Sequence, residues 1–278
     1  AQARSLCRFI GWVDGFPTKA DAYYVPKLYT EYLEESGNGS GAEFWDRQSK
    51  RNIDKGRKAL NPIVPARIRF LGVWDTVLAL GSRFRPRWKA LSEKVAFHTP
   101  ADPPDNVDHI RHALAIDERR HDFQPEIFAA GGSDVEQRWF AGVHSNIGGG
   151  LSEDGLANCA LRWLVDEAEK FGLAVERDFL GFYGESAFGR ASKKTTMYKT
   201  LDLTLRALRG FKGERNLEDA TGAAIDPSVF DRLNIDPDHL PETMDEAYRP
   251  KNLLRYLAGH PELHHQLNDS VKMAVSKL

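Results

Sequence analysis

Two side chains in the sequence are of the types that transfer protons in hydrolases, the carboxyl of Asp75 and the imidazole of His144. Asp75 ends the run "RFLGVWD" and His144 ends the run "VEQRWFAGVH". An imidazole is well suited to moving a proton near neutral pH, and a carboxylate bonded to it fixes its tautomer. Each position also suits a structural role, because an aspartate there can cap a backbone amide and a histidine can be satisfied at a loop corner. Taken together, they are the candidate acid and base of a hydrolase.

A glycine-rich loop follows the histidine in "HSNIGGG", where Gly148 and Gly149 let the backbone turn tightly without steric cost. Ser145 and Asn146 lie between the histidine and these glycines and are candidates for supporting the site. A phosphate-binding loop is the alternative interpretation. The stretch "HSNIGGG" lacks both the Gly-Lys-Ser/Thr ending and the dinucleotide-binding spacing that such a loop needs.

Both candidates come directly after segments that are typical of strands. The run from Ile68 to Val73 is apolar on both faces, as in an interior strand of a parallel sheet, and "VEQRWFAGVH" is the second such segment. Open α/β sheets bind ligands at the carboxyl ends of their strands. The pattern therefore predicts an α/β fold with the two candidates at one edge of its sheet.

The remaining segments have mainly helical patterns. Helices are predicted from the first residues to Val13, over 21–33, over 42–60 and over 156–171. A further helix is predicted over "VDHIRHALAIDERR" (107–120), with Val107, Ile110 and Leu114 as its apolar stripe. Its polar residues include Asp117 and Arg119, and we expect Asp117 to form a partly buried pair with a nearby arginine.

Composition excludes several classes of function. The chain has 278 residues, 41% hydrophobic and 28% charged, with a net charge of -2, which is typical of a globular protein and argues against nucleic acid as the main partner. It has no apolar run long enough to span a membrane and no signal-peptide pattern at its start. Without a cysteine cluster or a His-x-x-x-His set, we expect no metal and no other cofactor.

The nucleophile of such a hydrolase is not evident in the sequence. Hydrolases of the α/β type carry serine, aspartate and histidine in that order, with the serine in a Gly-x-Ser-x-Gly turn between a strand and a helix. The 278 residues contain no Gly-x-Ser-x-Gly. Because the sequence enters a helical pattern at once and contains only two strong strand segments, we expect the first strands and the turn to precede Ala1.

The sequence resembles the type VI secretion phospholipase effector family, whose bacterial catalytic domains are of the α/β-hydrolase type. The resemblance is carried by segments spread over almost the whole chain: "ARSLCRFIG", "FLGVWDTV", "FHTPADPPDNVDHIRHALAIDERRHDFQP", "RWFAGVHSNIGGG", "CALRWL" and "YRPKNL".

The resemblance implies a role for each matching residue. Asp75 would be the acid of a catalytic triad and His144 its base, with the serine a few residues upstream of Ala1 in a Gly-Phe-Ser-Arg-Gly-Ala turn. Asp117 and Arg119 would brace the site. The family often has an aspartate where this chain has Asn146, and this departure predicts an altered pH response rather than lost activity.

The resulting fold class is α/β, the C-terminal part of an α/β-hydrolase-like fold with a mainly helical C-terminal lobe. We expect residues 1–172 to form a partial catalytic core and residues 173–278 a helical and irregular extension of the same domain. The predicted activity is serine-dependent hydrolysis of phospholipid or other lipid esters, and the 278 residues alone are expected to be inactive. The alternative is a non-catalytic interaction or assembly module that retains the scaffold.

The resemblance also implies partners and a location. A neutralising immunity protein and a delivery component of the secretion system are expected from the family. The protein would reside in the cytoplasm of the producing cell and reach a target-cell envelope by a route that needs no signal peptide.

Overall fold

The structure, a computed structural model, describes residues 2–34, 39–77, 101–120, 123–129, 134–191 and 213–278. Its described residues divide into two compact units. The first holds the described residues up to Leu71 together with residues 101–110, 129, 134 and 135. The second holds the described residues of Gly72–Val77, Arg111–Phe128 and Glu136–Leu278.

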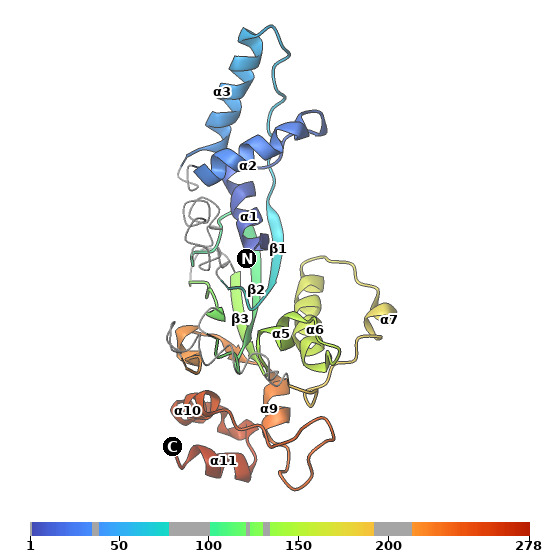
Figure 1. Ribbon diagram of the computed structural model, residues 1–278, viewed down its shortest axis with the longest axis vertical. Coiled ribbons are helices and arrows are strands. Elements are labelled where there is room, and N and C mark those ends of the chain that lie inside the picture. Colours follow the sequence, from blue (N-terminus) through green and yellow to red (C-terminus); the bar gives the residue numbers. More distant parts are fainter. Residues whose placement is uncertain (1, 35–38, 78–100, 121–122, 130–133, 192–212) are drawn as a thin grey trace, which may run out of the picture. The chain divides into compact units, whose positions relative to one another are not determined.

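Within the described residues, four strands form one sheet in the order β1-β2-β3-β4, and Figure 1 labels β1, β2 and β3 of this sheet. Their bounds are β1 Ile68–Trp74, β2 Val107–Ala115, β3 Asp134–Phe140 and β4 Ala224–Ile225. β1 and β2 run in the same direction, because the amides of Ile68 and Asp75 bond to the carbonyls of Asn106 and Ala113 in the same sequence order. β3 and β4 are also parallel. The predicted α/β class with a parallel sheet is confirmed.

The predicted helix over 107–120 is wrong, because its first part is the strand β2 (Val107–Ala115). The apolar stripe of that prediction left out Arg111 and His112, and both of these polar residues are buried. Arg111 pairs with Glu167 at 2.7 Å, and His112 accepts a hydrogen bond from the amide of Thr76 at 3.1 Å. With these polar groups satisfied inside the protein, pairing with β1 and β3 outweighs the helical spacing of the apolar residues.

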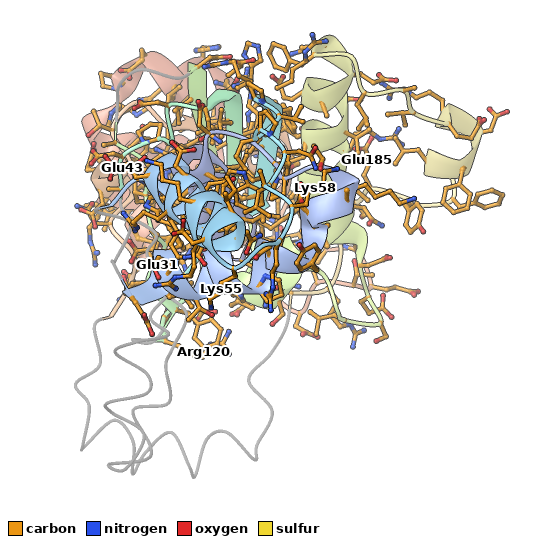
Figure 2. The ribbon with its side chains drawn as sticks, turned by 90° about the horizontal axis from the view of Figure 1, so that it is seen from above. Glu31, Glu43, Lys55, Lys58, Arg120 and Glu185 are labelled. Atoms are coloured by element: carbon orange, nitrogen blue, oxygen red, sulfur yellow. The ribbon has the colours of Figure 1, made fainter. Side chains whose placement is uncertain are left out.

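The first unit contains an aromatic core formed by three helices, α1 Gln2–Val13, α2 Val25–Glu34 and α3 Gly41–Asp54, with the short 3-10 helix η1 Lys19–Tyr24 before α2. The core residues of these helices include Phe9, Tyr32 and Trp45, which are almost fully buried. The charged side chains of Glu43 and Lys55 lie on the outside (Figure 2). The predicted helix up to Val13 is confirmed, and the one over 21–33 is divided into η1 and α2.

The second unit carries the remaining helices of the described residues: α5 His144–Gly148, α6 Gly155–Lys170, α7 Arg177–Leu180, η4 Leu217–Asp219, α9 Pro227–Leu233, α10 Lys251–Gly259, η5 Pro261–Gln266 and α11 Asp269–Val275. The helix expected over 156–171 is α6. The core of the second unit joins Leu114 and Trp139 of the sheet to Leu217, Leu253 and other apolar residues that follow residue 213. The carboxyl halves of β1, β2 and β3 belong to this unit, so it holds every candidate site residue.

Candidate active site

Asp75 and His144 meet at the carboxyl ends of β1 and β3. Asp75 follows the last residue of β1, and His144 opens the short helix α5 after a bend that follows β3. Nδ1 of His144 lies 2.7 Å from Oδ2 of Asp75. Because an ionised carboxylate only accepts hydrogen bonds, the neutral ring donates from Nδ1 and keeps a lone pair on Nε2. Nε2 has no hydrogen-bond partner among the residues that the structure describes.

The backbone of Asp75 is strained. Its φ is 39°, in the left-handed region that residues other than glycine rarely occupy. The conformation is held by the surrounding structure, in which the amide of Asp75 donates to the carbonyl of Ala113 at 2.6 Å. Strain of this kind gathers at functional sites, where a side chain must point in one particular direction.

A buried arginine, Arg215, binds the same carboxylate from the other side. Its Nη1 lies 2.6 Å from Oδ1 of Asp75, and its Nη2 lies 3.0 Å from Oδ2. Oδ1 also accepts the amide of Ala115 at 2.9 Å. Burial alone would raise the pKa of Asp75, but the hydrogen bond from His144, the charge of Arg215 and these further hydrogen bonds lower it to about 2. The carboxylate is therefore ionised at neutral pH although it is 0% exposed.

Sequence reasoning missed Arg215 because no local pattern points to it. It lies 140 residues beyond Asp75 in the chain. It stands in "GFKGERNLED", a charged stretch that is typical of a surface loop. Only the long-range contact with Asp75 distinguishes this arginine from an arginine of a surface loop.

The imidazole of His144 is also held by the loop that follows β2. The ring of Phe123 meets it edge to face, with centroids 5.0 Å apart. The amide of His144 donates to Oε2 of Glu118 at 3.2 Å. Glu118 in turn pairs with Arg120 at 2.7 Å, and the Arg120 guanidinium covers the Phe123 ring. Burial would raise the pKa of Glu118, but the bonds from Arg120 and the amide of His144 outweigh it and lower that pKa.

Asp117 does not form the ion pair with an arginine that we expected. Its Oδ2 accepts the amide of Gly142 at 2.7 Å, and the hydroxyl of Tyr248 donates to Oδ1 and Oδ2 at 3.1 and 3.0 Å. Burial raises the pKa of Asp117, which no neighbouring cation offsets fully. Arg119 is exposed and pairs instead with Glu214 at 3.2 Å. Among the described residues, the ion pair between two residues of this loop is Glu118 with Arg120.

Asn146 stabilises the turn that presents His144. Its Oδ1 accepts the amide of Val143 at 3.2 Å, and its Nδ2 donates to the carbonyl of Arg190 at 3.4 Å. Gly142 makes this turn possible, because its φ is 114° and a Cβ there would lie 2.5 Å from the Cβ of Asn146. Gly142 is a functional residue that the sequence analysis passed over, and "FAGVH" was the signal that could have revealed it.

The other loop candidates lie on the open side of α5. A Cβ added at Gly148 or Gly149 would meet nothing within 4 Å, and Gly149 has a positive φ of 79°. Ser145 is half-buried, and no described residue bonds to its hydroxyl. Since it follows His144 directly on a helix, the two side chains point in different directions.

The described residues contain no group of three or more His, Cys, Asp or Glu side chains that could hold a metal ion. Cys7 and Cys159 are free and buried. Burial raises the pKa of each thiol to about 11, so neither is a thiolate nucleophile at neutral pH. None of the described helices is long and apolar enough to cross a membrane.

Comparison with known proteins supplies the remaining context. The family model "T6SS, Phospholipase effector Tle1-like, catalytic domain" matches residues 1–167. A curated protein of Saccharomyces cerevisiae, "Uncharacterized protein YEL023C", is 44% identical over 45 residues. That match covers 14% of this chain and 7% of the yeast protein, so the chain spans only a small part of this relative. No solved structure matches the chain.

Proposed function

Since the chain belongs to the family of Tle1-like phospholipase effectors of type VI secretion, we propose that Asp75 and His144 are the acid and base of a serine-dependent lipid ester hydrolase. The observation that carries the proposal is the 2.7 Å contact between Nδ1 of His144 and Oδ2 of Asp75. It leaves Nε2 available to accept a proton, and the carboxylate that orients the ring is ionised. A neutral imidazole held in this orientation can act as a general base.

In the proposed reaction, a serine hydroxyl attacks the carbonyl carbon of a phospholipid ester while Nε2 of His144 accepts its proton. The carboxylate of Asp75 stabilises the imidazolium that forms. The tetrahedral intermediate collapses, His144 returns the proton to the leaving alcohol, and an acyl-serine remains. A water molecule, deprotonated by the same Nε2, then releases the fatty acid.

The serine is proposed from the resemblance to the family, whose Gly-Phe-Ser-Arg-Gly-Ala turn would place it before Ala1. The 278 residues contain no Gly-x-Ser-x-Gly. The turn would also supply one amide of the oxyanion hole. On this proposal the 278 residues alone are inactive, and the full-length protein is the enzyme.

The same premise extends to partners and location. As a type VI effector, the protein would be made in the cytoplasm of the producing cell and delivered by the secretion system to its target. An immunity protein that blocks the site and a delivery component are the proposed protein partners. Lipid esters are the proposed substrate.

The proposal is tested with the full-length protein, by labelling with a fluorophosphonate and by fatty acid release from phospholipid vesicles. We expect both in the wild type, and His144→Ala should abolish the vesicle activity and nearly all labelling. His239→Ala is the matched control, because His239 is largely exposed and its partner among the described residues is the surface carboxylate of Asp236. A folded wild-type protein that neither reacts with the probe nor hydrolyses lipid would overturn the proposal and favour a non-catalytic module on this scaffold.

A further inference from the structure

The carboxylate of Asp75 has more partners than proton transfer through His144 requires. A triad acid needs one bond to the imidazole, and Oδ2 makes it. Arg215 adds a two-point contact through Nη1 and Nη2. Both residues are buried, with Arg215 3% and Asp75 0% exposed.

This arrangement is expensive for the fold. Moving a guanidinium into the protein interior costs desolvation energy that an ion pair recovers only in part, and an apolar pair of the same volume would often be as stable. Moreover, Nε of Arg215 is buried without a hydrogen-bond partner among the described residues. Since stability alone gives little reason for such a residue, its position against the candidate acid calls for a functional explanation.

Arg215 is itself held in place. Its Nη1 also donates to the carbonyl of Ala115 at 2.7 Å, and its Nη2 to the carbonyl of Phe123. The side-chain amide of Asn252, on α10, donates to the backbone carbonyls of Arg215 and Ile116 at 3.2 and 2.9 Å. The guanidinium is thus a fixed fork whose geometry matches one rotamer of the Asp75 carboxylate.

We propose that Arg215 is a positioning residue for the Asp75–His144 pair: its two-point contact locks the carboxylate under the imidazole, and its positive charge partly neutralises that carboxylate. The inference rests on the proposed function and deepens it. Arg215 and Asn252 both lie beyond residue 167, where the family match ends. The C-terminal part of the chain therefore completes the site.

The two consequences of Arg215 are separable, because one depends on its geometry and the other on its charge. Arg215→Lys keeps a cation but loses the two-point contact, whereas Arg215→Gln loses the charge. Among the residues that the structure describes, the other charged groups around His144 are Asp75 and the Glu118–Arg120 pair, and all three are unchanged in both variants. A change in pH response in Arg215→Gln alone is therefore assignable to the charge of Arg215.

The experiment measures phospholipid hydrolysis by the full-length protein across pH, for variants that retain the wild-type circular dichroism spectrum. We expect Arg215→Lys to lower kcat about 10- to 100-fold with KM within about 3-fold, because a misplaced base slows the chemical step. In Arg215→Lys, the acid limb of the pH profile of kcat/KM should lie at the same pH as in the wild type. In Arg215→Gln that limb should move to higher pH by about one unit, since a carboxylate without its cation stabilises the imidazolium more strongly.

Arg111→Lys is the matched control, because Arg111 is a buried arginine of the same unit that pairs with Glu167 rather than with Asp75. It should leave kcat and the acid limb unchanged. If Arg215→Gln does not fold, Arg215→Lys decides alone: a folded Arg215→Lys with wild-type kcat overturns the inference. An Arg111→Lys variant that shows the same losses also overturns it, because the effect would then belong to any buried ion pair.

A second measurement separates this inference from the proposed function. NMR titration of the His144 ring needs no turnover, and its midpoint should rise by about one pH unit in Arg215→Gln relative to wild type. If the wild type hydrolyses no lipid but this midpoint moves, the proposed hydrolase is overturned and the coupling through Asp75 stands. If the wild type is active but neither the midpoint nor the kinetics respond to Arg215, the inference alone fails.

Discussion

Asp75 and Asp117 both follow strands of one parallel sheet, β1 and β2. The pKa of Asp75 is lowered from its usual value, whereas the pKa of Asp117 is raised. Burial raises the pKa of each. At Asp75 the His144 ring and the Arg215 guanidinium outweigh it, whereas the hydrogen-bond partners of Asp117 among the described residues are the neutral amide of Gly142 and the neutral hydroxyl of Tyr248. The comparison teaches that the charge of the partner, rather than burial, decides the direction in which the pKa of each carboxyl moves.

The largest expected difference between the two carboxyls is in activity. Asp75→Asn should lower kcat of the full-length protein about 10⁴-fold, because an amide cannot hold the imidazole in the required tautomer. Asp117→Asn keeps an acceptor for the amide of Gly142 and should cost less than about 10-fold, since it removes no group that touches the imidazole. Phospholipid hydrolysis measures both. Equal losses in the two variants would show that Asp117 takes part in the chemistry and would break the comparison.

The next difference is in the free energy of unfolding that is lost when a partner of each carboxyl is removed. Arg215→Met leaves a buried carboxylate without its cation and should lower the free energy of unfolding by about 3–5 kcal/mol. Tyr248→Phe removes one neutral donor from Asp117 and should cost about 1 kcal/mol. Urea unfolding at pH 7 compares them. A Tyr248→Phe variant as unstable as Arg215→Met would mean that the neutral bonds of Asp117 matter as much as the ion pair.

The pH dependence of stability should have opposite signs at the two sites. The folded pKa of Asp75, about 2, lies below its ordinary value of 3.8, so its stabilisation of about 2 kcal/mol is present above pH 4 and is lost as the pH falls from 4 to 2. The folded pKa of Asp117 is raised, so stability is lost as the pH rises through it.

Urea unfolding between pH 2 and 7 measures this difference in sign. The deficit of Asp75→Asn relative to wild type should grow as the pH rises from 2 to 4. The free energy of unfolding of Asp117→Asn should increase relative to that of the wild type as the pH rises above 4. A deficit of Asp117→Asn that grows with pH in the manner of Asp75→Asn would contradict the raised pKa of Asp117.

The last comparison concerns Gly142, whose amide bonds to Asp117 and which lies in the turn before His144. Gly142→Ala should cost about 1–3 kcal/mol, because its φ is 114° and the added Cβ would lie 2.5 Å from the Cβ of Asn146. Gly148→Ala in the same loop meets no atom within 4 Å and should stay within about 0.5 kcal/mol of wild type. Thermal unfolding of both variants tests the contrast. Equal costs would mean that Asn146 moves aside and that the close approach is not required.

Much of the site was predictable from local pattern. The apolar run that becomes β1 predicted that Asp75 would stand at the end of a strand, and the run "VEQRWFAGVH" predicted the same for His144. Because parallel strands bring their carboxyl ends to one edge, two such residues are candidates to meet, as they do at 2.7 Å. The resemblance to the family agrees with the match over residues 1–167.

The sequence by itself determined the α/β class, the strand that ends at Asp75 and the histidine turn, because apolar periodicity and glycine placement are local properties. Only the tertiary structure decided that residues 107–115 form a strand and that Arg215 binds Asp75. The physical reason is the same in both cases. Strand pairing and a buried ion pair gain their free energy from groups far apart in the chain, and no local pattern of residues carries that information.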